Sequence, residues 1–346
     1  MRTQIIKIED AVGKILYHDI TKIVKDGFKG AAFKKGHIIQ PQDIQQFLNL
    51  GKEHVYVLEL EPGEIHEDEA GSRLAKAAAG DGVTFSQPRE SKVNLFAGQA
   101  GLLKINLEAL EAVNDLPDVI LSTLPNNTVV KEGEMLAGTK VIPLVVQEEV
   151  LLEAEKIAAE AGSIIKVLPF LEKKISIIIT GNEVYKGRIK DAFGPVLSEK
   201  ILPYGSKVLE VDYAPDDADV IAEKIILSVE KGADIILVSG GMSVDPDDVT
   251  PLGIRLSGAE IVKYGSPVLP GAMFLMAYRG NVAVLGMPAC GMYFRTTVLD
   301  LLLPLLLVGE RISRRDIVKL AHGGLCRSCP RCRYPNCTFG IGVSQK

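Results

Sequence analysis

The sequence has no tryptophan and few aromatic residues, which make up 5% of its 346 residues. A hydrophobic core must therefore rest on isoleucine, leucine and valine. The sequence also lacks a basic excess, since its formal net charge is −5. A nucleic-acid-binding protein more often shows a basic face, so we expect no nucleic-acid partner.

Long apolar segments are missing as well. The longest apolar run, at 298–308, is interrupted by Asp300 and Pro304. It falls short of the roughly 20 residues that a membrane-spanning helix needs. Residues 1–14 carry acids and have no apolar central region, so they do not resemble a signal peptide. These absences predict a cytoplasmic protein without a membrane partner.

The chain is long enough for two or three domains of roughly 100–200 residues each. Residues 61–82 are acidic at first and then rich in alanine and glycine, which is typical of a linker. The pattern predicts four segments: a small α+β domain at 1–70, a β-rich domain with a connecting helix at 71–172, an α/β domain at 173–312 and a Cys-rich tail at 313–346.

The fold class follows from the third of these segments. Three runs, at 175–179, 233–238 and 281–285, consist almost entirely of apolar residues, many of them β-branched. Continuous apolar strands are typical of a parallel sheet that is buried on both faces. Between two of these runs, residues 217–231 carry an apolar stripe at helical spacing. Alternating strands and helices predict a three-layer α/β domain with a mostly parallel sheet.

In such sheets, ligands bind beyond the carboxyl ends of the strands. The run 233–238 leads directly into Ser-Gly-Gly-Met-Ser at 239–243. Glycines let the backbone approach an anion, and successive N–H groups can form an anion-binding nest. Three acids follow within 245–248, so a hard cation such as Mg²⁺ is expected between them and a bound phosphate. A Gly-rich turn with an acidic helix cap is the structural alternative.

Two other strand ends carry small or polar residues. At 180–183 (Thr-Gly-Asn-Glu), the hydroxyl and the glycine backbone could face a ligand and the glutamate could bind a cation. At 286–288 (Gly-Met-Pro), small residues would let a bulky ligand lie against the backbone. Simple turns are the alternative at both places. Cys290 is expected to be a small buried hydrophobic residue rather than a nucleophile, and Asp191 is expected to cap a helix.

Taken together, these strand ends resemble the molybdenum cofactor biosynthesis domain family over about residues 174–307. The spacing from Ser-Gly-Gly to Asp248 is the most specific feature, and the forms Thr-Gly-x-Glu and Ser-Gly-Gly-x-Ser look most like the molybdopterin molybdotransferase branch. The resemblance implies catalytic or metal-site acids at Glu183, Asp217 and Asp248, and pterin-binding residues at Thr180, Gly181, Ser239, Gly240, Gly241, Ser243, Gly286 and Pro288.

The resemblance implies a protein of molybdenum cofactor biosynthesis that uses molybdopterin, Mg²⁺ and molybdate as a molybdotransferase-like enzyme. A molybdopterin adenylyltransferase is one alternative. Another is a non-enzymatic carrier that delivers the cofactor to apo-molybdoenzymes. Because members of this family are oligomers, the resemblance also implies a homo-oligomer.

The sequence departs from the family pattern at three places. Asp245 stands where the family usually has glycine, and the motif Pro-Gly-Lys-Pro appears as Pro-Gly-Ala-Met at 270–273, without its lysine. The motif Ser-Ala-Met-Asp-Gly-Tyr-Ala of the molybdotransferase N-terminal half is absent. Ligand binding is therefore better supported than catalysis of metal insertion.

Four of the five cysteines lie within twelve residues, with the spacing C-x₂-C-x₂-C-x₄-C. In a cytoplasmic protein such a cluster predicts a metal site before it predicts disulfides. Three cysteines at this spacing look more like iron–sulfur ligation than like the paired knuckles of a zinc site. Zinc, and redox thiols without a metal, remain alternatives. The predicted ligands are Cys326, Cys329, Cys332 and Cys337.

Overall fold

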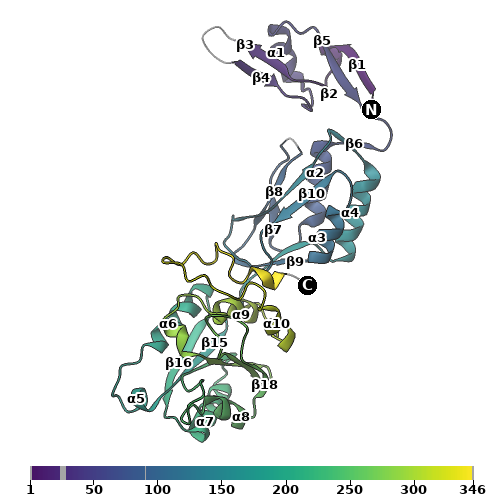
Figure 1. The fold of residues 1–346 in the computed structure, drawn as a ribbon. Coiled ribbons are helices and arrows are strands. Elements are labelled where there is room, and N and C mark those ends of the chain that lie inside the picture. Colours follow the sequence, from purple (N-terminus) through teal and green to yellow (C-terminus); the bar gives the residue numbers. More distant parts are fainter. Residues whose placement is uncertain (1, 24–28, 90, 345–346) are drawn as a thin grey trace. The chain divides into compact units, whose positions relative to one another are not determined.

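The computed structural model describes residues 2–23, 29–89 and 91–344 (Figure 1). The chain divides into two compact units, which we call unit 1 and unit 2. Unit 1 comprises residues 1–98, 106–124 and 133–166, and unit 2 comprises residues 99–105, 125–132 and 167–346. Two short segments from the N-terminal half of the chain therefore belong to unit 2.

The first part of unit 1 contains a three-stranded antiparallel sheet and a separate hairpin. Its core includes the stacked rings of Phe33 and Phe47, whose centroids are 4.0 Å apart. The elements are β1 (Arg2–Lys7), η1 (Ile8–Asp10), β2 (Ile15–Leu16), β3 (Ile20–Ile23), β4 (Lys29–Phe33), η2 (Pro41–Asp43), α1 (Ile44–Asn49) and β5 (His54–Glu59).

The second part of unit 1 contains a four-stranded antiparallel sheet in the order β10-β12-β8-β7. Arg73 joins helix α2 to helix α4, because it donates to Glu148 at 2.9 Å and to Glu155 at 2.8 Å. The elements are β6 (Glu64–His66), α2 (Glu67–Ala78), β7 (Val83–Phe85), β8 (Val93–Ala97), α3 (Leu107–Asn114), β10 (Val119–Thr123), β12 (Met135–Val141), β13 (Val145–Gln147) and α4 (Glu148–Glu160).

The linker predicted at 61–82 is wrong, because helix α2 occupies most of it. The buried face of α2 is made largely of small residues, including Ala70, Gly71 and Ala78. A helix that packs closely through alanine and glycine has a weak apolar stripe, and its composition resembles that of a flexible segment.

Unit 2 is built on a six-stranded sheet in the order β16-β15-β17-β20-β19-β18. The first four strands run parallel to one another. Strand β19 runs antiparallel to its neighbours β20 and β18, so β18 has the same direction as the first four strands. Two strands outside this sheet, β9 and β11, pair with each other. The strands are β9 (Gly101–Ile105), β11 (Val129–Val130), β15 (Lys174–Thr180), β16 (Lys207–Ala214), β17 (Ile235–Ser239), β18 (Glu260–Tyr264), β19 (Leu275–Arg279) and β20 (Val282–Met287), while β14 (Ile165–Leu168) spans the boundary between the units.

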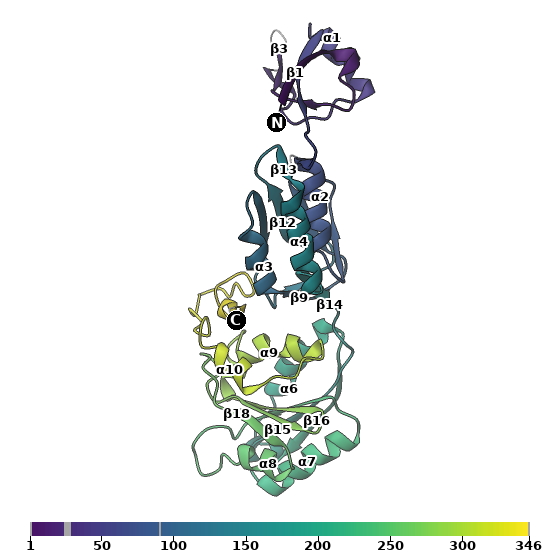
Figure 2. The same cartoon turned by 90° about the vertical axis from the view of Figure 1, so that its right-hand side faces the viewer.

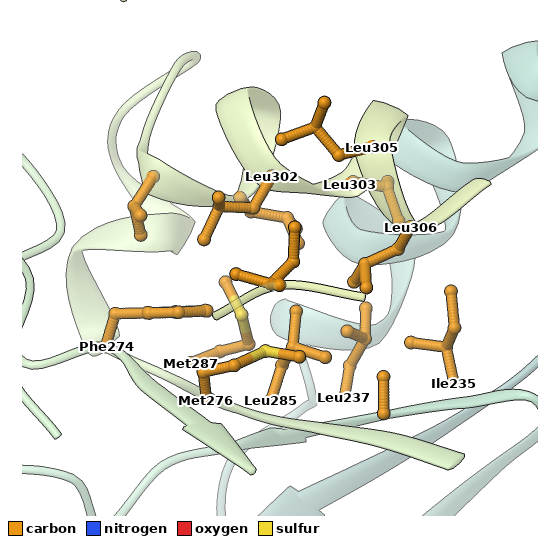
Figure 3. Packing of buried hydrophobic residues seen from close by; sticks show 14 of the residues in the cluster. Ile235, Leu237, Phe274, Met276, Leu285, Met287, Leu302, Leu303, Leu305 and Leu306 are labelled. Atoms are coloured by element: carbon orange, nitrogen blue, oxygen red, sulfur yellow. The ribbon is translucent and has the colours of Figure 1, made fainter. Parts of the chain in front are cut away.

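Helices cover both faces of this sheet (Figure 2). On one face, Leu237 and Leu285 pack beneath Leu302 and Leu306 of α9 (Figure 3). This confirms the predicted α/β layering with a mostly parallel sheet. The helices are α6 (Phe193–Ile201), α9 (Val298–Leu307) and α10 (Arg314–Lys319) on that face, α7 (Ala218–Glu230) and α8 (Thr250–Leu256) on the opposite face, and the short α5 (Asn182–Tyr185), η3 (Leu202–Tyr204), η4 (Ala289–Met292) and η5 (Ile341–Ser344).

The apolar run at 298–308 is explained by this layering. Almost every residue of α9 is buried, and Asp300 completes a capping box with Thr297 at its start. Within the described residues, no helix combines the length and the apolar character needed to cross a bilayer.

We predict that Leu302→Ala lowers the free energy of unfolding by about 3 kcal/mol, because the substitution leaves a cavity between α9 and the sheet. Leu302 is fully buried, whereas Leu252 on α8 is 50% exposed. The matched control Leu252→Ala should change stability by less than about 0.5 kcal/mol. Urea unfolding followed by circular dichroism measures both, and equal losses would contradict the packing described here.

Candidate functional site

A cavity of about 390 Å³ lies at the carboxyl ends of β17 and β20. Three stretches of chain line it: the loop after β17, at 240–243 with Asp248; the loop before β19, at 269–273; and the turn after β20, at 288–290. Its position agrees with the general location of ligand sites in open α/β sheets.

The ends of β15 and β17 approach each other closely at this cavity. The hydroxyl of Thr180 donates to the carbonyl oxygen of Ser239 at 3.0 Å and lies 3.3 Å from the hydroxyl of Thr250 at the start of α8. Gly240 has a φ of +97°, and a Cβ on it would lie 2.5 Å from the carbonyl oxygen of Thr180. Gly241 has a φ of +55°. Both the backbone conformation and the lack of space therefore require glycine here.

The loop after β17 presents donors without acceptors. In the part of the chain that the structure describes, the backbone N–H groups of 240–243 donate to no other residue. The buried hydroxyl of Ser239 has no hydrogen-bond partner among the described residues either. Successive free N–H groups around glycines can bind an anion.

Tyr264 at the end of β18 holds this loop from another side. Its hydroxyl donates to the carbonyl oxygen of Met242 at 2.7 Å. Partial burial, and then the negative charge of Asp248, raise the pKa of Tyr264. The hydroxyl therefore keeps its proton and remains a donor. No sequence pattern pointed to this residue, because its contact with the loop depends on the pairing of the sheet.

The three predicted acids lie in different surroundings. Asp248 lines the cavity and accepts a hydrogen bond from the N–H of Asp245 at 3.0 Å. Asp217 caps α7 by accepting from two backbone N–H groups of its first turn, at 3.0 and 3.1 Å. Glu183 is exposed, and neither it nor Asp217 lines the cavity. Among the described residues, no three His, Cys, Asp or Glu side chains are arranged to hold a metal.

The predicted pterin-binding residues fall into two groups. Gly240, Gly241, Ser243 and Pro288 line the cavity. The others do not line it and are buried at the strand ends, where they hold the loops in place: Thr180, Gly181, Ser239 and Gly286.

Several lining residues had not been predicted, including Met242 and Leu269. Cys290 also lines the cavity and is half-buried. Burial raises the pKa of its thiol, which disfavours the reactive thiolate form. Asp191 accepts from the N–H of Phe193 at 2.7 Å and caps α6, as expected.

Two family models match parts of the chain. A model described as "Domain of unknown function" matches residues 5–59. A model described as "Probable molybdopterin binding domain" matches residues 176–307.

Curated relatives share short stretches with this chain. A CinA-like protein of Mycobacterium avium is 31% identical over 90 residues, which are 26% of this chain and 21% of that protein. A protein of Archaeoglobus fulgidus is 38% identical over 78 residues, which are 22% of this chain and 34% of that protein. The chain thus spans between about a fifth and a third of the length of these two relatives.

Solved structures resemble a part of the chain. The molybdopterin biosynthesis enzyme MoaB from Thermus thermophilus aligns with 40% of this chain and 98% of its own, at 20% identity and a TM-score of 0.35. The molybdopterin biosynthesis Mog protein from Mycobacterium ulcerans aligns with 39% of this chain and 94% of its own, at 23% identity and a TM-score of 0.34. With the family model matched over the six-stranded sheet and the cavity at its edge, residues 176–307 belong to the probable molybdopterin-binding domain family.

Proposed function

We propose that the protein binds molybdopterin, with the phosphate of the ligand on the loop at 240–243. The observation that carries this proposal is the run of free backbone N–H groups around Gly240 and Gly241, which open into a cavity of about 390 Å³. Consecutive N–H groups favour an anion such as phosphate. The match of residues 176–307 to the molybdopterin-binding family supports pterin as the rest of the ligand.

The charge of the cavity calls for a cation. Among the described residues, Asp248 is the only charged one in its lining, which includes no lysine or arginine. An acid beside a bound phosphate would repel it. Mg²⁺ is bound in proteins by one or two carboxylates together with phosphate oxygens, and Asp248 fits that role. We therefore propose that Mg²⁺ accompanies the ligand and would be held by Asp248, and that its charge would offset that of the phosphate.

The arrangement of the acids favours binding over catalysis. Of the three acids implied by the family resemblance, only Asp248 lines the cavity, and the carboxylate of Asp217 is used to cap α7. We therefore keep two candidate functions for this protein: a carrier of the molybdenum cofactor, and a molybdotransferase-like enzyme that inserts molybdate. A homo-oligomer, and delivery to apo-molybdoenzymes, stay predictions of the resemblance.

The first prediction concerns the loop backbone. Gly240→Ala should destabilise the protein by about 2 kcal/mol more than Gly232→Ala, and it should abolish molybdopterin binding. Both glycines have positive φ, but an added Cβ meets Thr180 at Gly240 and nothing within 4 Å at Gly232. Thermal unfolding and anaerobic pterin binding measure the two effects. Unchanged binding in Gly240→Ala would contradict the loop as the phosphate site.

The second prediction concerns the cation. Asp248→Asn keeps an acceptor for the N–H of Asp245 but removes the charge, so Mg²⁺ should no longer strengthen molybdopterin binding. In wild type, adding Mg²⁺ should tighten binding roughly tenfold or more, which corresponds to about 1.4 kcal/mol. Asp247→Asn, at an exposed acid outside the cavity lining, is the matched control and should behave like wild type. Calorimetric titration with and without Mg²⁺ gives both affinities, and the idea fails if Asp248→Asn retains the Mg²⁺ effect.

The third prediction separates the candidate activities. A carrier incubated with molybdopterin, Mg²⁺ and molybdate should show no repeated turnover, but protein loaded with cofactor should activate an apo-molybdoenzyme once. Multiple rounds of molybdate insertion would instead identify a molybdotransferase, and consumption of ATP together with molybdopterin would identify an adenylyltransferase. Release of cofactor and nucleotide products can be followed by chromatography.

A further inference from the structure

The C-terminal segment that carries the cysteines has little regular secondary structure between Ala321 and Gly340. It is attached to the rest of unit 2 at a few points. Leu325 forms a parallel bridge with Leu269. The N–H of Leu269 donates to Gly324 and the N–H of Cys326 donates back to Leu269, both at 2.8 Å. The segment therefore adds a short strand-like edge to the loop that precedes β19.

All four cysteines of this segment line a single cavity of about 510 Å³. Cys326 and Cys337 are half-buried and pack against the edge of the hydrophobic core, whereas Cys329 and Cys332 are exposed. The stretch 293–296 after β20 lines the same cavity, and the hydroxyl of Thr296 lies 3.4 Å from the sulfur of Cys332. Chain segments that are distant in sequence thus surround the four thiols.

The charged residues that line this cavity are of one sign. Arginines line the same cavity, and within the described part of the chain no aspartate or glutamate does. Four thiolates on one divalent metal leave a net charge of about −2. Neighbouring guanidinium groups favour such an anionic group. The arginines are Arg295, Arg327, Arg331 and Arg333.

We propose that Cys326, Cys329, Cys332 and Cys337 form one four-thiolate metal site, which binds Zn²⁺ or an iron–sulfur cluster. Among the described residues, no three of these side chains are arranged as a metal site. Sulfurs around one zinc ion lie about 4 Å apart. Metal binding therefore draws the exposed thiols of the turn at 328–333 toward the half-buried pair.

The site is placed to act on the ligand cavity. The segment is paired to Leu269, and Leu269 and its neighbours 270–273 line that cavity. The stretch 293–296, which lines the thiol cavity, follows closely after the turn at 288–290, which lines the ligand cavity. Metal binding at the cysteines thus fixes two of the three stretches around the ligand. This regulatory part of the inference rests on the proposed function, whereas the metal site does not.

The test uses the full chain purified without oxygen and without added pterin. Elemental analysis should give about one zinc, or iron together with acid-labile sulfide, per chain. Iron with sulfide identifies the cluster, and zinc alone identifies the mononuclear site. The double variant Cys329→Ser/Cys332→Ser should lose this metal, and because both thiols are exposed it should still fold. Cys290→Ser, at the one cysteine outside the segment, is the matched control and should retain the metal.

Hydrogen exchange of the metal-bound, chelated and double-variant proteins tests the coupling. Amide exchange in 267–273 and 289–296 should speed up roughly tenfold when the metal is lost, while α4 in unit 1 should be unchanged. Wild-type protein treated with a chelator provides this comparison if the double variant does not fold. Absence of metal, even after reconstitution with Zn²⁺ or with iron and sulfide, would overturn the site. Bound metal with unchanged exchange in both loops would overturn the coupling, and neither result depends on pterin binding.

Discussion

The candidate site depends on the close approach between the ends of β15 and β17. The hydroxyl of Thr180 binds the carbonyl oxygen of Ser239, and the backbone of Thr180 leaves no room for a side chain on Gly240. The chain turns here through the positive φ angles of Gly240 and Gly241, and the N–H groups of 240–243 donate to no other described residue. The same turn carries Asp248 to the cavity. The close packing at the strand ends thus lies next to both parts of the proposed site, the backbone of 240–243 and Asp248.

The sheet and its covering helices could be predicted because burial on two faces leaves a strong signal. β15, β17 and β20 appear in the sequence as unbroken apolar runs, and the stripe of α7 has the helical period. The edge strand β16 was missed, because it alternates exposed and half-buried residues. Helix α2 was also missed, because small residues form its buried face. In each case the packing partner, rather than the segment itself, decides the structure.

The site was predicted only in part for a similar reason. The residues that directly follow a strand, such as Gly240, Gly241 and Pro288, could be placed because the carboxyl ends of parallel strands share one edge. The loop at 269–273 precedes an antiparallel strand, so no such rule placed it beside them. For the acids, a position near a strand end was not enough to predict the role of the side chain. Asp217 and Asp248 are the same residue type near strand ends, yet one satisfies the N–H groups of a helix and the other faces a cavity.

Two of the cavities in unit 2 have opposite charge requirements. In the ligand cavity at the end of β17, the described lining residues offer free N–H groups and a carboxylate but no basic side chain. A phosphate bound there would need a cation beside it. In the thiol cavity of the C-terminal segment, the described lining residues offer thiols and arginines but no acid. This lining suits the proposed anionic thiolate centre. The loop at 269–273 is shared, since it lines the first cavity and pairs with the segment that forms the second. The proposed coupling between the two cavities would run through this shared backbone.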